Sequence, residues 1–342
     1  RRLLENGANN SFVNRLVDDR APIEDIIADP IDKVNRISKK SNAQIPLPRD
    51  LYDKKWLNSY GPDLSDINAV NRIYDDFDYY LQKEFFAYPI INGKLLNHRN
   101  ARTISNPANK DHVIGSAHDC PSEVINEVFE ISVKAQKQWG KTNVDDRAKC
   151  LENMADILEE EMNFFMTILT IEGGKTIDDC VSEVREAIDF CRYYASQARD
   201  LFSHPLELSG VTGENNSLSY HARGVFACIS PWNFPLAIFV GQIAAAIMAG
   251  NSVIAKPAEQ TPMIAMRAVR LMHEAGIPEG VVNLMPGGGE IGAALVAHID
   301  VAGVAFTGST EVAQDINQAL ASKKDAPIVP LIAETGGQNC MI

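Results

Sequence analysis

Apolar residues recur with the spacing of helices in some parts of this chain and with the spacing of strands in others. These changes of spacing divide the chain into predicted elements. From Pro121 apolar residues recur three and four positions apart, which predicts an amphipathic helix that begins at the proline. The same spacing predicts two further helices, at about 145–170 and 175–201. We expect these helices to cover one face of a sheet. At 206–223 apolar and polar positions partly alternate around a Gly-Glu-Asn-Asn turn, which indicates a β-hairpin.

Beyond Gly224 short apolar runs alternate with helix-length segments. The runs predict buried strands at 225–229, 252–255, 281–285, 301–306 and 328–333. The intervening segments predict helices at 236–249, 264–275, 291–298 and 311–320. Strands that are joined through helices pair in parallel. The predicted fold class is therefore α/β, with a doubly wound, mostly parallel sheet.

The region before this fold lacks its regular pattern. Residues 21–84 are polar, rich in Asp, Asn, Lys and Pro, and carry only short apolar repeats, such as Ile23, Ile26 and Ile27. This pattern is typical of a helical linker with loops.

Composition and charge disfavour several classes of function. The 342 residues, 45% of them hydrophobic and 23% charged, suffice for about two folded domains. A net charge of -13 disfavours nucleic acid or an anionic membrane as the main partner, although it leaves room for a local basic patch. The longest apolar run, from Pro235 to Ala249, is interrupted by Gln242. It is shorter than the roughly 20 residues that span a bilayer, so no integral membrane segment is expected.

The number and spacing of the cysteines indicate the cellular compartment in which the protein is expected. The six cysteines show neither CxxC pairing nor His-rich spacing, and no signal peptide is recognisable. Reduced thiols in the cytoplasm are therefore expected, without a metal site.

Polar residues follow the ends of the predicted strands, where an α/β sheet presents its ligand site. In ISPWNFP, Asn233 follows a strand and its amide can donate to an oxyanion; the alternative is an Asx turn that caps the next helix. In KPAEQTP, Lys256 and Glu259 can bond ribose hydroxyls, and Glu259 would repel a 2′-phosphate, which favours NAD over NADP. The alternative for this pair is a solvated ion pair.

Two further motifs follow later strands. FTGST places Gly308 and Ser309 where backbone N–H groups and a hydroxyl can meet a pyrophosphate, although such a serine is also an ordinary N-cap. Glu334, in AETGGQN, is a candidate general base; the alternative is an acid that bonds nearby N–H groups. The glycines of GGGEIG do not fit the spacing GxGxxG and predict a turn only.

In this order, PWNFP, KPAEQTP, FTGST and ETGG resemble the aldehyde dehydrogenase superfamily over about residues 84–342. The resemblance implies a Rossmann-like NAD-binding domain at 85–205 and 224–333, an oligomerisation hairpin at 206–223, and the start of a truncated catalytic domain at 334–342. It implies that Asn233 holds the oxyanion and that Glu334 activates the deacylating water. The cofactor contacts that it implies are Ile229, Ser230, Pro231, Trp232, Lys256, Glu259, Gly292, Phe306, Gly308 and Ser309.

The first residues narrow the resemblance. RRLLENGANNSFVNRL, within residues 1–20, is similar to the last barrel helix of proline dehydrogenase, where Arg1, Arg2 and Glu5 match the motif that holds the substrate. Adjacent arginines suit a carboxylate, although RRLLE is commonly a solvated helix face. Together the two resemblances imply a bifunctional proline-degrading enzyme. FAD, in a missing domain, would oxidise proline, and NAD would serve the oxidation of L-glutamate γ-semialdehyde, derived from pyrroline-5-carboxylate, to glutamate.

Two departures from the family pattern matter. The family's nucleophilic cysteine belongs to a motif of the type GQxC that lies farther downstream of the ETGG acid. Cys340 lies only six residues past Glu334, so it is not taken as that cysteine and is expected to be a buried structural thiol. The turn GGGEIG is one residue shorter than the family's loop. The fragment alone is therefore expected to be inactive. The alternatives are another NAD-dependent aldehyde dehydrogenase, which RRLLENG argues against, and a non-catalytic assembly fragment.

Overall fold

The structure is a computed structural model that describes residues 16, 18–38, 42, 44–52, 55–97, 101–324 and 326–337. Contacts divide the chain into two units, residues 1–48 and residues 49–342. The first contains the short helices α3 (Ile23–Ile27) and α4 (Pro30–Arg36). Asp29 caps α4, because its carboxylate accepts the Ile31 N–H at 2.8 Å.

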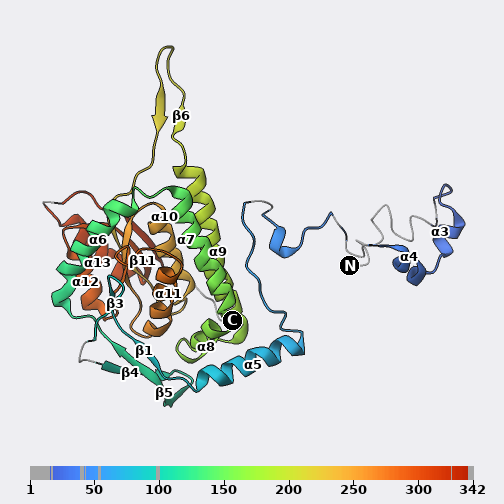
Figure 1. Ribbon diagram of the computed structural model, residues 1–342, viewed down its shortest axis with the longest axis horizontal. Helices are drawn as coiled ribbons and strands as arrows, with labels where there is room; N and C mark the ends of the chain where they lie inside the picture. Colours follow the sequence, from blue (N-terminus) through green and yellow to red (C-terminus); the bar gives the residue numbers. More distant parts are fainter. Residues whose placement is uncertain are drawn as a thin grey trace. The chain divides into compact units, whose positions relative to one another are not determined.

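A seven-stranded sheet forms the centre of the second unit (Figure 1). From one edge to the other its strands are β12 (Leu331–Thr335), β11 (Val301–Gly308), β8 (Val225–Ile229), β9 (Ser252–Lys256), β10 (Val282–Leu284), β2 (Ile90–Ile91) and β3 (Lys94–Leu95). Every pair from β12 to β10 is parallel, whereas β2 and β3 pair antiparallel. The predicted α/β fold with a mostly parallel, doubly wound sheet is therefore confirmed.

Helices pack on both faces of this sheet (Figure 1). One face carries α6 (Ile125–Trp139), α12 (Gly289–Ala297) and α13 (Thr310–Ala321), and the other carries α7 (Val144–Glu160), α8 (Met162–Ile171), α9 (Ile177–Phe202), α10 (Ala237–Met248) and α11 (Pro262–Glu274). Strand β8 divides its side chains between the two cores: Ala227 joins one cluster, and Phe226 and Cys228 join the other. Successive side chains of a strand point to opposite faces, so a fully apolar strand serves both cores.

The helix predicted at 145–170 is two helices in the structure. Helix α7 ends and α8 begins around Glu161, whose backbone leaves the helical region at φ -93° and ψ 16°. The apolar spacing continues across this break, which is why the pattern predicts a single element. Short 3₁₀ helices lie at Pro48–Asp50 and Ser122–Val124.

A second, three-stranded sheet was not predicted. Its order is β1 (Phe85–Ala87), β5 (Asn109–His118) and β4 (Ala101–Asn106), with β1 parallel and β4 antiparallel to β5. Helix α5 (Ile67–Leu81) precedes it and buries Ile73 and Phe77 in the same core as α8. Part of the segment that the sequence describes as a linker is thus packed with the sheet, although the domain boundaries themselves stay predictions.

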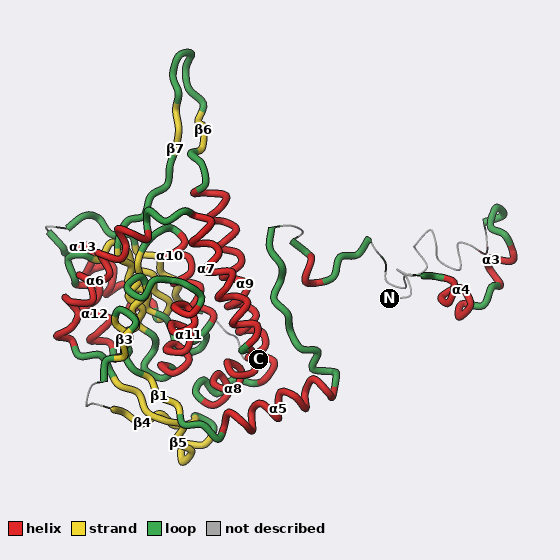
Figure 2. The backbone as a smooth tube through the Cα atoms, in the orientation of Figure 1, coloured by secondary structure: helices red, strands yellow, loops and turns green. Residues whose placement is uncertain are grey.

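The predicted hairpin is present, as β6 (Leu206–Leu208) and β7 (Asn216–Leu218). The two strands pair antiparallel, with Leu206 opposite Leu218, and extend away from the rest of this unit (Figure 2). All their side chains are exposed. Among the described residues, the search for an apolar helix of membrane-spanning length finds none.

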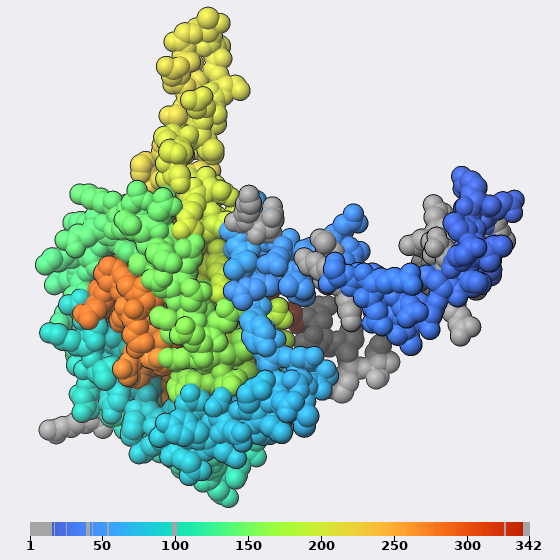
Figure 3. Space-filling view, turned by 45° about the vertical axis from the view of Figure 1, so that its right-hand side comes forward, coloured from blue at the N-terminus to red at the C-terminus, as the bar shows by residue number. Residues whose placement is uncertain are grey.

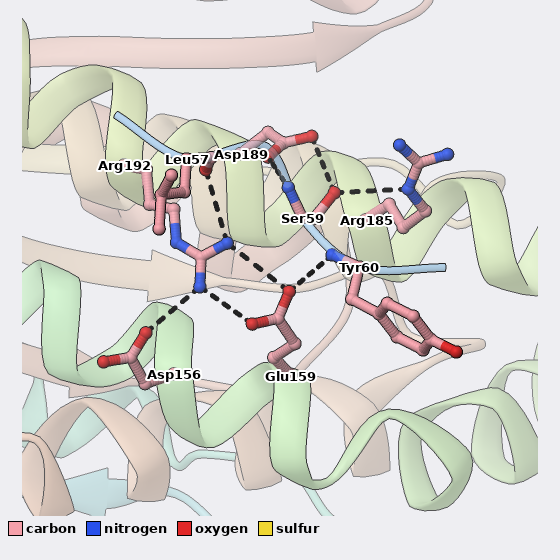
Figure 4. Close-up of polar contacts among 8 residues, drawn as sticks. All are labelled: Leu57, Ser59, Tyr60, Asp156, Glu159, Arg185, Asp189 and Arg192. Atoms are coloured by element: carbon pink, nitrogen blue, oxygen red, sulfur yellow. Dashed lines mark hydrogen bonds and ion pairs between the residues drawn. The ribbon is translucent and has the colours of Figure 1, made fainter. Parts of the chain in front are cut away.

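Residues 56–60, which we call the strap, lie across helices α7 and α9 (Figure 3). Asp189 accepts the Ser59 N–H at 2.7 Å and the Ser59 hydroxyl at 2.8 Å. Glu159 accepts the Tyr60 N–H at 2.5 Å (Figure 4). Two backbone N–H groups of the strap are thereby satisfied by side chains of two helices, which fixes the strap along a defined path.

Arg192 joins both helices and the strap. Its guanidinium lies 3.0 Å from the carboxylates of Glu159 and Asp156 and donates to the Leu57 carbonyl at 3.4 Å (Figure 4). Only 7% of Arg192 is exposed. Burial lowers the pKa of Arg192, but the hydrogen bonds that it donates to Glu159 and Asp156 outweigh this effect and raise the pKa. A buried, charge-assisted contact of this kind is strong, and removing one partner leaves the others unpaired.

We expect Arg192→Met to release the strap, because the Leu57 carbonyl loses this donor and Glu159 loses its charged partner. An unpaired buried group costs about 1–3 kcal/mol, so trypsin cleavage after Lys55 should accelerate about tenfold. Mass spectrometry of timed digests measures the rate. The matched control is Arg199→Met, which removes an ion pair with Glu152 on the same two helices without touching the strap. Equal cleavage rates in the two variants would contradict the role given to Arg192.

Candidate functional site

A cleft of about 900 Å³ opens at the carboxyl ends of β8, β9, β11 and β12. It brings together residues from PWNFP, KPAEQTP, FTGST and ETGG, which are far apart in the sequence. Among the residues that line it are the predicted Ile229, Ser230, Pro231, Trp232, Asn233, Lys256, Glu259, Gly292, Phe306, Gly308, Ser309 and Glu334.

Strand register explains this convergence. Ile229 pairs with both Lys256 of β9 and Phe306 of β11, and Thr307 pairs with Glu334. The chain runs from β8 to β9 and β10, then returns to the other side of β8 as β11. The cleft therefore lies at a topological switch point, where the loops on either side of β8 diverge.

Lys256 is buried at the end of β9, and its ammonium lies 3.7 Å from the half-exposed Glu259 carboxylate. Burial lowers the pKa of Lys256, while the Glu259 charge raises it and so opposes the shift. The two groups thus present a cation and an acceptor at the same wall of the cleft. This arrangement suits vicinal hydroxyls better than a second anion.

The residues at the start of α13 combine two roles. Ser309 accepts the Val312 N–H at 3.3 Å, so it is an N-cap, as the alternative reading of FTGST proposed. Ser309 also lines the cleft. At Gly308 a Cβ atom would lie 2.5 Å from the Phe306 ring, so only glycine lets that ring pack against the turn.

Asn233 is exposed in the loop 231–235, and its backbone carbonyl accepts the Lys175 ammonium at 3.0 Å. The alternative interpretation, an Asx cap on the next helix, is wrong. The Leu236 and Ala237 N–H groups at the start of α10 donate instead to Glu183, at 2.8 and 3.3 Å. Asn233 lines the cleft and does not cap α10.

Glu334 lies in β12 between two spaces. It lines the 900 Å³ cleft, and it also lines a cavity of about 320 Å³ under α9 and α10. Phe190, Tyr194 and Ile238 form part of that cavity. Phe306 also borders both spaces. Glu334 and Phe306 thus form part of the walls of both spaces.

Glu172 and Glu183 hold the helices that follow two loops of the cleft, and the sequence reasoning missed both. Both Glu172 oxygens accept N–H groups at the start of α11, from Met263 at 2.7 Å and from Ile264 at 3.0 Å. Burial raises the pKa of Glu172 to about 8, and these two bonds oppose the shift. Glu183 lies on the same stripe of α9 as buried apolar residues. A charge on an apolar stripe is costly unless it is paired, which is the signal that could have identified it.

The described cysteines are poor nucleophiles. Burial raises the pKa of Cys120 and Cys191 to about 12 and that of Cys180 to about 11, and it also raises that of Cys228. None of these lines the cleft. Within the described residues we find no group of His, Cys, Asp and Glu suited to a metal. Cys340, Arg1, Arg2 and Glu5 lie outside the described residues.

A family model for the aldehyde dehydrogenase family matches residues 97–342, and the chain belongs to this family. Over its full length it is 40% identical to the bifunctional protein PutA of Salmonella typhimurium, of which it covers 26%. The chain is also similar to a crystal structure of a variant of Bradyrhizobium japonicum proline utilization A (PutA), with a TM-score of 0.82 and 46% sequence identity. This match covers 98% of this chain and 31% of the Bradyrhizobium chain. A Thermus 1-pyrroline-5-carboxylate dehydrogenase with bound NAD is 30% identical over 83% of this chain and 56% of that one, with a TM-score of 0.79.

The raised pKa of Glu172 makes stability depend on pH. Between pH about 4.5 and 8 the folded state keeps a proton that the unfolded state has lost, so the stability that Glu172 contributes falls as pH rises through this window. Glu172→Gln should flatten that fall. Urea unfolding midpoints at pH 5, 6, 7 and 8 measure it, with the exposed Glu127→Gln as the control. Parallel pH profiles for Glu172→Gln and the unmodified chain would refute the assignment.

Proposed function

We propose that this chain is the NAD-binding part of an aldehyde dehydrogenase that oxidises L-glutamate γ-semialdehyde to glutamate. The observation that carries the proposal is the position of Glu334, between the cleft on one face of the sheet edge and the cavity on the other. A cofactor and an aldehyde held there would meet beside a carboxylate. The names PutA and 1-pyrroline-5-carboxylate dehydrogenase, borne by similar proteins, support this choice of substrate.

The residues of the cleft fit a dinucleotide. The Ser230 hydroxyl is buried and has no hydrogen-bond partner among the described residues, which is typical of a group that a ligand completes. Gly289, in the first turn of α12, has no atom within 4 Å of its Cβ position, so a pyrophosphate can approach the helix N-terminus. Lys256 and Glu259 would hold the adenosine ribose. NAD bound in this way would supply the hydride acceptor.

Asn233 would stabilise charge on the aldehyde oxygen. Its amide is a neutral donor at the cleft wall, and a donor of fixed direction acts on the oxyanion without adding a competing charge. Glu334 would take a proton from the water that releases the product, because its residue lines both spaces and a carboxylate can act as a general base.

The reaction also needs a thiolate. The buried cysteines described above hold their protons, and Cys340 lies only six residues past Glu334, whereas the family's nucleophile belongs to a motif farther downstream of the ETGG acid. We therefore propose that the chain by itself oxidises no aldehyde. NADH formation by the purified chain would contradict this.

The chain covers about a quarter to a third of the PutA proteins that it matches, so their other activities come to it only as proposals. One is that a longer protein also oxidises proline with FAD. Another is that the exposed hairpin β6–β7 packs against a second copy, because an isolated two-stranded hairpin is marginally stable in water.

An assay of the longer protein tests the function directly. With NAD, L-glutamate γ-semialdehyde should give a kcat/KM at least about tenfold above that of an apolar aldehyde such as propanal. Equal values would favour another aldehyde dehydrogenase, and the absence of aldehyde-dependent NADH would favour an assembly role.

We expect Glu259→Gln in the longer enzyme to relax the preference for NAD over NADP by about tenfold, because the carboxylate no longer repels a 2′-phosphate. The ratio of kcat/KM values for the two cofactors measures it. Glu311→Gln, which alters an exposed acid at the start of α13, is the control. Equal efficiency with both cofactors in the unmodified enzyme would overturn the assignment.

Glu334→Gln should separate the two halves of the reaction. An amide cannot accept the proton of water, so the first turnover should still produce NADH while later turnovers slow about 100-fold or more. Stopped-flow absorbance would show a burst followed by a slow steady state. Steady-state turnover equal to that of the unmodified enzyme would exclude Glu334 as the base.

A further inference from the structure

A buried ion pair lies behind the loop 231–235, on the side away from the cleft. Glu183 is in α9 and has no exposed side-chain surface, and Lys175 precedes that helix with 12% of its side chain exposed. The Lys175 ammonium donates to one Glu183 oxygen. Neither residue lines the cleft, so neither touches a ligand there.

The other Glu183 oxygen holds the start of α10. It accepts the Leu236 N–H at 2.8 Å and the Ala237 N–H at 3.3 Å, and α10 has no cap from its own N-cap side chain. The first N–H groups of a helix lack partners within the helix, so an acceptor from another element fixes where the helix begins. The end of the loop is thereby tied to α9.

Lys175 holds the middle of the same loop. Its ammonium donates to the Asn233 carbonyl at 3.0 Å and lies 3.9 Å from the centre of the Phe234 ring. The two contacts flank the peptide bond between these residues. Because Lys175 holds the carbonyl, this peptide cannot rotate freely, and Asn233 keeps its place in the wall of the cleft.

The turn that delivers Lys175 is itself well defined. Helix α8 ends at Ile171, and in the turn that follows Gly174 adopts a positive φ of 67° and the Lys175 N–H returns to the Leu169 carbonyl at 3.2 Å. A glycine in this conformation is a common helix stop, after which the chain reverses. The ammonium therefore comes from a rigid turn and not from a mobile surface side chain.

We propose that Lys175 and Glu183 are positioning residues for the reaction, which act through Asn233 by holding its amide toward the oxyanion. The inference rests on the proposed function. Loss of one oxyanion donor costs about 10²- to 10³-fold in kcat, and a shift of 1 Å in a reacting group costs about 100-fold. Loss of the Lys175 contacts should therefore slow the chemistry while the remote ribose contacts at Lys256 and Glu259 keep cofactor binding intact.

The test uses the longer enzyme and the rate of its first turnover. Lys175→Met keeps an apolar chain against Phe234 but removes the donor, so the NADH burst should slow about 10- to 100-fold. Its Kd for NAD, measured by fluorescence titration, should stay within about threefold of the unmodified value. Lys175→Arg keeps charge and donors and should restore most of the burst rate. This pattern differs from that of Glu334→Gln, which spares the burst.

Two further variants separate positioning from stability. Arg267→Met removes a comparable half-buried ion pair with Glu161 that is remote from the Asn233 loop, and it should leave the burst rate unchanged. Asn233→Ala combined with Lys175→Met should be no slower than Asn233→Ala alone, because the lysine acts through the asparagine.

The outcomes are distinct. A burst rate in Lys175→Met that matches the unmodified enzyme would overturn the positioning role and leave the proposed function intact. Additive losses in the double variant, or no rescue by Lys175→Arg in an enzyme that binds NAD normally, would also overturn it. An unmodified enzyme that forms no NADH from any aldehyde would overturn both proposals together.

Discussion

The N-terminal N–H groups of α10 and α11 need acceptors, and the side chains of two buried glutamates supply them. Glu183 serves α10 and Glu172 serves α11, and both come from the same short stretch around the end of α8 and the start of α9. Burying a carboxylate is unfavourable unless donors surround it, and a helix N-terminus offers such donors. The N–H groups offset the unfavourable burial of the glutamate, and the glutamate offsets the unfavourable burial of the N–H groups. The α8–α9 connection and the helices α10 and α11 must therefore be placed together.

This constraint matters for the cleft because each capped helix directly follows one of its loops. The loop after β8 leads into α10, and the loop after β9 leads into α11. The strand ends determine where the loops start, and the carboxylates determine where they stop. Buried interactions thus hold both ends of each loop, while the side chains of the loop remain open to a ligand. This suits a site that requires several separate groups in fixed positions.

Sequence patterns predicted secondary structure and burial correctly where the environment of a residue depends on its neighbours in the chain. Strand β8 runs over the predicted 225–229, because an unbroken apolar run can only be buried on both faces. The three-stranded sheet was missed because β1 has three residues and is completed by strands later in the chain. Glu172 and Glu183 resemble solvated helical acids until their partners, 53 to 92 residues away, are known. Ser309 shows a further limit of the sequence patterns. The two interpretations of its motif were treated as alternatives, but Ser309 both caps α13 and lines the cleft.

The long sequence separation of these capping bonds has a consequence for how the molecule folds. Contacts between distant parts of a chain form after local ones, since loop closure must precede any gain. The loops after β8 and β9 cannot acquire their final shape until the α8–α9 connection has docked, so we expect the cleft to be ordered late. The same loops should open early when the native state fluctuates, and the amides of Leu236 and Met263 would report that opening through hydrogen exchange.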